Sequence, residues 1–172
     1  MDWKKFFTPH ENWKRELIIF FAGLISGAVI LFAGMILYLR FHLVEEYTSS
    51  RVFEEAALGL PDTVADSVPE WSTAYERCFL PTLPNGKRII SYKLCNQAYA
   101  HSMLSDPDDR RAAAAIPCTF AIFEREDGSA GLVRYNTRLL GWIFGGAPGA
   151  VFREAVSADQ EKLIRDMAFE KK

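Results

Sequence analysis

Histidine and the familiar catalytic signatures are scarce in this sequence. It contains three histidines, and only His101 lies far from the apolar N-terminal region. A GxSxG elbow, an HExxH helix, a Walker loop and a dinucleotide-binding glycine motif are all missing. Each of these supplies a nucleophile, metal ligands or a phosphate cradle to a large class of enzymes. A triad hydrolase would have to recruit His101, so the sequence leans away from an enzyme and predicts no catalytic residue.

An excess of positive charge is missing as well. The chain has 20 Lys and Arg against 22 Asp and Glu, a formal net charge of −2. A basic stripe or patch is the first requirement for binding phosphate backbones. The composition therefore predicts no nucleic-acid partner.

What the chain does have is one long uncharged stretch, Leu17 to Leu39. As a helix it would span roughly 34 Å, enough to cross a hydrocarbon core about 30 Å thick. A cleaved signal peptide is the competing interpretation, but its apolar core runs only about 7–15 residues and ends in small residues. Here the bulky residues Arg40 and Phe41 follow instead. The stretch therefore predicts a retained transmembrane helix over residues 17–39.

Basic residues on the flanks predict its orientation. They precede the apolar stretch more often than they follow it: Lys4, Lys5, Lys14 and Arg15 come before it, and Arg40 comes after it. Lysine and arginine favour the cytoplasmic side of a membrane. We therefore expect a single-pass cell-membrane protein with a cytoplasmic segment 1–16. Residues 45–172 then form one extracytoplasmic domain, which is periplasmic if the source is bacterial.

Glycines inside this stretch suggest a packing surface. Gly23 and Gly27 form a GxxxG pattern, and Gly34 follows seven residues later on the same helical face. Small residues on one face allow a second helix to approach closely, although glycine is also common in membrane helices without such a role. Besides the lipid bilayer, the expected partners are another membrane protein or a second copy of the chain.

The remaining residues show two kinds of periodicity. Alternating apolar residues predict strands over 88–95, 118–126 and 130–135, the last two joined by Asp127-Gly128 as a type I′ hairpin. Helical spacing predicts a helix before Pro61 and a short one after it, a helix capped at Asn96, one capped at Asn136 or Thr137, and a last helix capped at Ser157. Strands followed by segregated helices predict an α+β domain, a small antiparallel sheet with helices on one side.

Cys95 and Cys118 are the residues most able to carry chemistry. Cys95 ends one predicted strand and Cys118 begins the next, so the two thiols can meet if these strands are antiparallel neighbours. Three interpretations stay open: buried free thiols, a structural disulfide, or a redox or metal role. Without a tight CxxC spacing no metal site is predicted. No cofactor is predicted either, and metal or haem is left as the less favoured alternative.

The segment from Leu139 to Phe152 carries no charge over 14 residues. It contains Trp142 and several glycines. One interpretation is a pair of core helices with a glycine hinge. The other is an apolar surface that meets a partner, a ligand or the nearby membrane. On the second interpretation Trp142 is a candidate binding residue.

Four short motifs occur in a recognisable order. They are Cys95-Asn96 after a strand, Ile116-Pro117-Cys118 opening the next strand, Asp127-Gly128 in a hairpin, and Asn136 to Gly141 in a closing helix. This pattern resembles the domain-of-unknown-function family numbered 302, over roughly residues 50–170. Gln97 departs from it, because the family usually has proline there.

This resemblance implies a compact α+β domain similar to the TATA-box-binding-protein-like fold, without its DNA function, and often a homodimer. It carries no activity with it. Cys95, Asn96, Pro117 and Cys118 match its most recognisable positions and are therefore candidate binding residues. Together these observations predict a membrane-anchored binding or accessory domain, either a subunit of a membrane complex or a small-ligand-binding module. The alternative is a thiol-based redox or metal- or haem-handling protein centred on Cys95 and Cys118.

Overall fold

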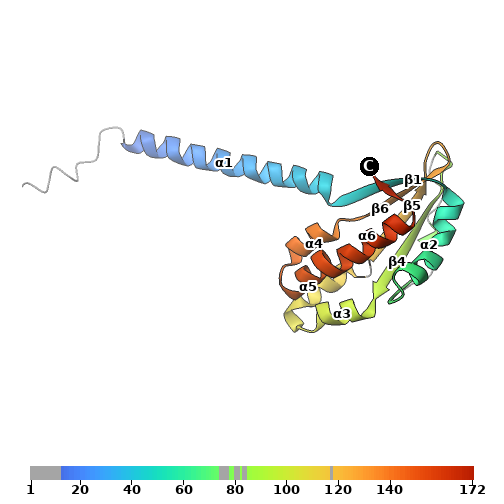
Figure 1. Cartoon of the computed structure of the whole chain (residues 1–172). Coiled ribbons are helices and arrows are strands. Elements are labelled where there is room, and N and C mark those ends of the chain that lie inside the picture. Colours follow the sequence, from blue (N-terminus) through green and yellow to red (C-terminus); the bar gives the residue numbers. More distant parts are fainter. Residues whose placement is uncertain (1–12, 74–77, 80–81, 83–84, 117) are drawn as a thin grey trace, which may run out of the picture. The chain divides into compact units, whose positions relative to one another are not determined.

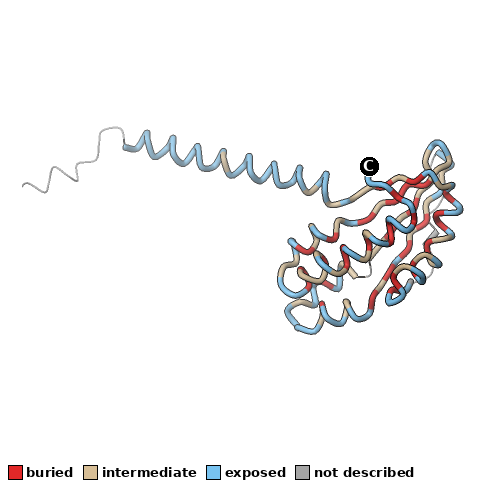
Figure 2. The backbone as a smooth tube through the Cα atoms, in the orientation of Figure 1, coloured by how far each residue is buried: buried red, intermediate tan, exposed pale blue. Residues whose placement is uncertain are grey.

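The computed structural model describes residues 13–73, 78–79, 82, 85–116 and 118–172. The chain divides into two compact units, one containing the first helix and the other residues 42–172. The first helix, α1 (Trp13–His42), contains the whole predicted apolar stretch, and none of its residues is buried. In Figure 2 the residues of α1 are almost all coloured as exposed. By length and composition α1 can cross a membrane, a test that a signal sequence also passes.

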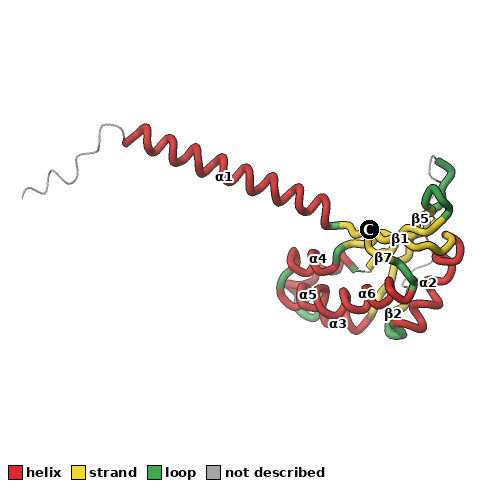
Figure 3. Tube along the Cα trace, turned by 45° about the horizontal axis from the view of Figure 1, so that its top comes forward, coloured by secondary structure: helices red, strands yellow, loops and turns green. Residues whose placement is uncertain are grey.

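The second unit is an antiparallel sheet with helices on one side, as predicted (Figures 1 and 3). The strands follow the order β2-β4-β5-β6-β1-β7, and β3 also pairs with β4. Their bounds are β1 (Val44–Val52), β2 (Trp71–Thr73), β3 (Cys78–Phe79), β4 (Ile89–Asn96), β5 (Cys118–Glu124), β6 (Ser129–Tyr135) and β7 (Glu170–Lys171). β1 was not predicted, because its inward positions carry the polar residues Glu45 and Ser49 as well as Tyr47.

The helical elements are α2 (Phe53–Ser67), α3 (Gln97–Leu104), the 3-10 helix η2 (Pro107–Ala115), α4 (Thr137–Phe144), α5 (Gly146–Val151), the π-helical turn η3 (Phe152–Val156) and α6 (Ser157–Asp166). The predicted caps of two of them are confirmed. Asn96 Oδ1 accepts from Tyr99 N at 3.1 Å, and Asn136 Oδ1 accepts from Leu139 N at 3.0 Å. Such bonds satisfy amides that have no partner within the helix.

The predicted break at Pro61 is wrong, because α2 continues through this proline. A proline inside a helix leaves the carbonyl four residues earlier without its backbone donor. That carbonyl belongs to Ala57, and the Tyr92 hydroxyl donates to it at 2.6 Å. Tyr92 is buried in the core. A bond from the sheet therefore replaces the missing helical one.

Two further local predictions are corrected. Ser157 does not cap the last helix, because η3 runs into α6 without a break and Ser157 has helical angles. The β5–β6 hairpin is present, but it is not type I′, because Gly128 has a positive φ of 81° whereas Asp127 does not. Gly128 N donates to Arg125 O at 3.0 Å. This bond makes a type I turn followed by a left-handed glycine, the usual three-residue hairpin loop.

The core lies between the sheet and its helices. Register places Ile90 opposite Ile122 and Tyr92 opposite Phe120, and these side chains point to the helical side. Phe53 and Leu60 of α2 and Phe152 of η3 complete this buried cluster. The alternating burial along the strands is visible in Figure 2. Consequently every inward position of β4, β5 and β6 lies under helices, and one such position is an arginine.

Candidate functional site

Arg134 is that inward arginine, and its guanidinium is almost completely buried. Nη2 lies 2.8 Å from Glu45 Oε2 and donates to the Tyr47 hydroxyl at 2.9 Å. Nη1 donates to Gln160 Oε1 of α6 at 2.7 Å. A buried charge is tolerated only when a counter-ion and hydrogen bonds replace its hydration. Arg134 therefore requires these partners. We call the group the Arg134 cluster, and with Lys171, which binds Glu45, it consists of Glu45, Tyr47, Arg134, Gln160 and Lys171.

Glu45 connects this cluster to the last strand. Its carboxylate accepts from Lys171 Nζ at 2.6 Å and from the Tyr47 hydroxyl at 3.0 Å. Burial alone raises the pKa of Glu45, but the Lys171 hydrogen bond and the Arg134 charge outweigh it and hold the pKa below its usual 4.5. Because Glu45 is the third residue after α1, the cluster fixes the start of the domain to its core and to its last strand.

Sequence reasoning missed the Arg134 cluster, although one signal was present. In the predicted strand 130–135, alternation puts Ala130, Leu132 and Arg134 on the same face. The first two are fully buried, so a charged residue at the third inward position requires a buried partner. The partner was not identifiable, because β1 was not predicted.

The two candidate cysteines do not share a site. β4 and β5 are antiparallel neighbours, but the register pairs Cys118 with Leu94. Paired residues point to the same face and adjacent residues to opposite faces, so Cys118 points to the helical side and Cys95 to the other side. Both are free and half-buried. A Cys95–Cys118 disulfide would need a register shifted by one residue, and in this structure both thiols are free.

Cys118 extends the Arg134 cluster instead. The Gln160 side chain hydrogen-bonds to its thiol, while the same amide accepts from Arg134. Burial, and to a smaller degree the nearby Cys95, raises the pKa of Cys118 to about 12. A thiol with so high a pKa is protonated at neutral pH and is a poor nucleophile or metal ligand. This environment gives no support to the redox alternative.

Asn96, the third candidate, lies on the same face as Cys118. Its side chain caps α3, and its Nδ2 is buried without a partner within the described residues. The other two buried side-chain atoms of this kind are Arg134 Nε and Thr137 Oγ1. All three belong to residues where β4 and β6 end and α3 and α4 begin. Pro117, the remaining candidate of this group, lies outside the described residues.

A second polar contact, partly buried, lies at the start of α6. Asp159 Oδ2 accepts from Trp71 Nε1 and from the Tyr99 hydroxyl, both at 2.8 Å. The two rings pack edge to face at 5.9 Å. Burial, and then the hydrogen bond and charge of Asp159, raise the pKa of Tyr99 to about 12. The contact holds β2 and α3 against α6, which is a structural role.

Trp142 is separate from these residues, on the exposed side of α4. It is 74 % exposed, and Ile143 beside it is 55 % exposed. The Arg153 guanidinium lies 5.0 Å from the Trp142 ring centre. On the inner side, a Cβ added to Gly149 would come within 2.4 Å of the Gly141 carbonyl oxygen. The uncharged segment from Leu139 to Phe152 thus packs against the domain through its glycines. It also presents an apolar outer surface at Trp142 and Ile143.

The glycines of α1 are open to a neighbour. A Cβ added at Gly23, Gly27 or Gly34 would meet nothing within 4 Å. The Ser26 hydroxyl donates to Gly23 O at 3.0 Å, so this polar group is satisfied within the helix. A smooth face of this kind fits close helix packing, which stays a prediction.

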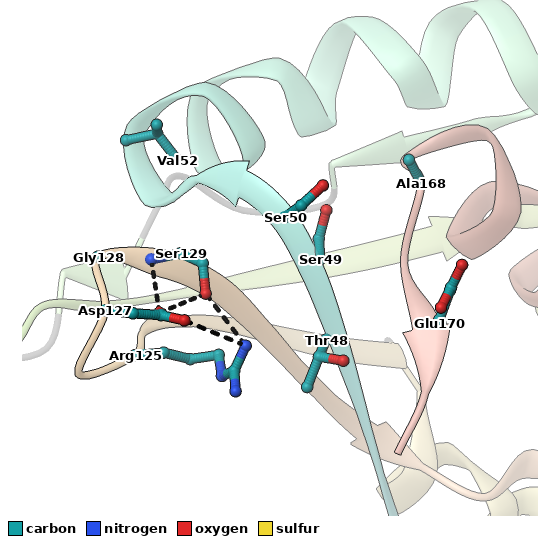
Figure 4. Close-up of a pocket in the computed structure, with 10 residues that line it drawn as sticks. All are labelled: Thr48, Ser49, Ser50, Val52, Arg125, Asp127, Gly128, Ser129, Ala168 and Glu170. Atoms are coloured by element: carbon teal, nitrogen blue, oxygen red, sulfur yellow. Dashed lines mark hydrogen bonds and ion pairs between the residues drawn. The ribbon is translucent and has the colours of Figure 1, made fainter.

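A cavity of about 650 Å³ lies where β1 separates from β6 (Figure 4). Its lining comes from β1, from the β5–β6 hairpin and from the residues around β7: Thr48, Ser49, Ser50, Val52, Arg125, Asp127, Gly128, Ser129, Ala168 and Glu170. A smaller one of about 340 Å³ lies between α2 and β4. Among the described residues no three His, Cys, Asp or Glu side chains gather to hold a metal ion.

Comparison with known proteins identifies the fold. No profile of a known protein family matches the sequence, and no curated protein matches it. Among solved structures, the chain is similar to an uncharacterized conserved protein, DUF302, from Bacillus stearothermophilus, with a TM-score of 0.61 and 10 % sequence identity. The similarity covers 73 % of this chain and 98 % of the other. The α+β domain thus has the DUF302 fold that the sequence motifs implied, while the TATA-box-binding-protein-like topology stays a prediction.

Proposed function

We propose that this protein is a single-pass membrane protein whose extracytoplasmic domain binds or assembles with other molecules and does not catalyse a reaction. The observation that carries the proposal is the surface of α1. Its large apolar side chains are exposed, and those of Ile18, Ile30 and Leu31 are each more than 60 % exposed. Apolar surface of this extent is unfavourable in water. A bilayer is the environment that matches a helix of this length.

The junction after α1 supports retention of the helix. α1 ends at His42, and β1 begins at Val44, so a single residue separates them. Asn136 N donates to Leu43 O at 2.9 Å, and Glu45 belongs to the Arg134 cluster. Signal peptidase needs an accessible segment of small residues. A cut shortly after the apolar stretch would instead remove residues that bind the core.

Fractionation of cells that express the full chain tests the anchor. We expect an unprocessed chain of 19.5 kDa that stays in the membrane pellet after alkaline carbonate washing. Replacing Ile30 and Leu31 with arginine should release it, because each central arginine costs about 2.5–3.5 kcal/mol of insertion free energy. The matched control exchanges the two residues as Ile30→Leu and Leu31→Ile. A shortened soluble chain that lacks the apolar stretch would refute the anchor, and a reporter joined to either terminus tests the orientation.

Two exposed surfaces support the binding role. They are the glycine face of α1, defined by Gly23, Gly27 and Gly34, and the outer side of α4 with Trp142 and Ile143. Extraction in mild detergent followed by mass spectrometry and an absorbance spectrum tests this role. We expect a stoichiometric second subunit or a dimer, lost in Gly27→Leu and kept in the control Ala28→Leu, which points about 100° away round the helix. A colourless monomer would contradict the proposal, and a chromophore would favour the thiol, metal or haem alternative.

A further inference from the structure

The cavity in Figure 4 exists because β1 contains extra residues. Thr48 pairs with Gly131 and Val52 with Ser129, so Ser49, Ser50 and Arg51 lie opposite the single residue Ala130. Arg51 N donates to Ser49 Oγ at 3.3 Å. Serine side chains offer the backbone such an alternative to the ladder of a sheet. Bulges of this kind are frequent next to functional sites, because they redirect side chains and end strand pairing.

The guanidinium of Arg125 at one side of this cavity is only partly engaged. Its contacts are to Ser129 Oγ at 3.1 Å and to Asp127 Oδ2 at 3.8 Å, and both use Nη1. Nε and Nη2 thus form an edge that no described residue occupies. Such an edge matches a carboxylate with two parallel hydrogen bonds. Asp127 does not occupy this edge, because two hydrogen bonds from Ser129 to its Oδ1 fix the carboxylate on the side of Nη1. The same two bonds hold the pKa of Asp127 below its usual value.

Glu170 provides a negative charge at the opposite side. Figure 4 shows Arg125 and Glu170 on the two sides of β1, with Thr48, Ser49 and Ser50 along the strand. Glu170 and Ser50 are exposed, and neither binds another described residue through its side chain. The cavity therefore combines a free cationic edge, a free carboxylate and intervening hydroxyl groups.

We propose that this cavity binds a small zwitterion, an amino acid or a short peptide. Its carboxylate pairs with Nε and Nη2 of Arg125, its ammonium group with Glu170, and its amide groups with the hydroxyls of Thr48 and Ser50. A polyanion fits less well, because Asp127 and Glu170 oppose it, and an apolar ligand would leave the charges of Arg125 and Glu170 without partners. The proposal adds a ligand to the function proposed above and does not depend on the membrane anchor.

Calorimetric titration of the full chain in non-ionic detergent tests the proposal. The probes are the dipeptide Ala-Ala, N-acetyl-Ala-Ala, Ala-Ala amide and inorganic phosphate. We expect saturable binding of Ala-Ala, at least tenfold weaker binding of the two blocked forms, and no binding of phosphate. Charge-assisted hydrogen bonds of this kind are worth about 1.5–3 kcal/mol, which corresponds to a loss of tenfold or more.

Variants assign the two ends of the ligand. Arg125→Gln should weaken the binding of Ala-Ala at least tenfold and leave the binding of Ala-Ala amide unchanged. Glu170→Gln should weaken the binding of Ala-Ala at least tenfold and leave the binding of N-acetyl-Ala-Ala unchanged. Arg111→Gln and Glu154→Gln are the matched controls, since both residues are exposed and lie outside the lining. The proposal is overturned if Ala-Ala fails to bind the wild-type chain, if blocking either end has no effect, or if phosphate binds as tightly. These results are independent of whether the chain is retained in a membrane.

Discussion

Glu45→Gln is the substitution that tests the energetics of this domain most directly. It keeps the shape of the side chain and removes the negative charge beside Arg134, whose side chain is only 3 % exposed. Arg134 then retains Tyr47 and Gln160 as neutral acceptors but has no counter-ion within the part of the chain that the structure describes. Removing one partner of a buried ion pair costs about 3–5 kcal/mol. Glu45 is itself 11 % exposed, so some water can reach the site, and we expect the lower end of this range, about 3 kcal/mol.

A loss of this size is measurable, because domains are stable by only about 5–15 kcal/mol. The assay is urea unfolding of the full chain in non-ionic detergent, followed by the fluorescence of the buried Trp71. Glu161→Gln is the matched control, because its pair with Arg138 is 3.0 Å long but exposed, and such pairs contribute at most about 1 kcal/mol. Equal midpoints for the two variants would refute the reasoning.

A double-mutant cycle with Arg134→Met separates charge burial from packing. Arg134→Met leaves Glu45 with Lys171 and the Tyr47 hydroxyl, so we expect it to cost less than Glu45→Gln. The double variant should cost less than the sum of the two single variants by about 1 kcal/mol or more, because the second change removes a charge that the first left unpaired. Additive costs would show that the two groups do not interact.

The same carboxylate gives the domain a pH dependence. The pKa of Glu45 in the folded chain lies below 4.5, and the unfolded chain therefore binds its proton more tightly. Its contribution is fully present above the unfolded pKa and is lost as the pH falls through the folded pKa. In Glu45→Gln the free energy of unfolding at neutral pH should therefore be lower than in the wild-type chain. It should also change less as the pH falls through the pKa of Glu45, which urea unfolding at a series of pH values measures.

Three further predictions concern local features. Gly149→Ala should destabilise the domain by about 1–3 kcal/mol, because the added Cβ would collide with the Gly141 carbonyl. Gly59→Ala, where an added Cβ meets nothing, should be neutral or stabilise the domain by up to about 1 kcal/mol. Urea unfolding of the two variants compares these free energies. Ala168→Gly should stabilise by about 0.5–1 kcal/mol, because Ala168 has a φ of 57° at the end of α6, where Phe169 N bonds to Ile164 O in a Schellman cap. In an alkaline titration monitored by tyrosinate absorbance, Tyr99 should ionise near pH 12, and this step should be missing in Tyr99→Phe. Because the pKa of Tyr99 is raised in the folded chain, its contribution to stability is present below pH 10 and is lost at higher pH.

Local signals in the sequence predicted what local forces determine. The caps at Asn96 and Asn136 and the position of the hairpin depend on residues within a few positions of one another, and they are confirmed. The type of hairpin turn was wrong, because Asp127 keeps a negative φ and only Gly128 takes a positive one. Local chemistry thus places an element more reliably than it fixes the backbone angles within it.

Features that depend on distant residues were missed. The helix continues through Pro61 because Tyr92, 35 residues from Ala57, supplies a hydrogen bond. β1 was missed because its inward face is partly polar, and it is stable because Arg134 pairs with Glu45 across the sheet. In both cases the local pattern argues against the structure, and a tertiary contact reverses the outcome.

The reactivity of the thiols tests the register of β4 and β5, which pairs Cys118 with Leu94. The sequence alone did not predict this register. With a pKa of about 12, about 10⁻⁴ of Cys118 is thiolate at pH 8, roughly three orders of magnitude less than for an ordinary thiol. Site-resolved alkylation with iodoacetamide should therefore modify Cys118 in the native chain about a thousandfold more slowly than in the urea-unfolded chain. Gln160→Leu removes the amide that favours its thiolate and should not accelerate the reaction. If Cys118 reacts at the unfolded rate, or if a Cys95–Cys118 disulfide forms in the native protein, then the pairing of Cys118 with Leu94 is wrong and a redox role regains its basis.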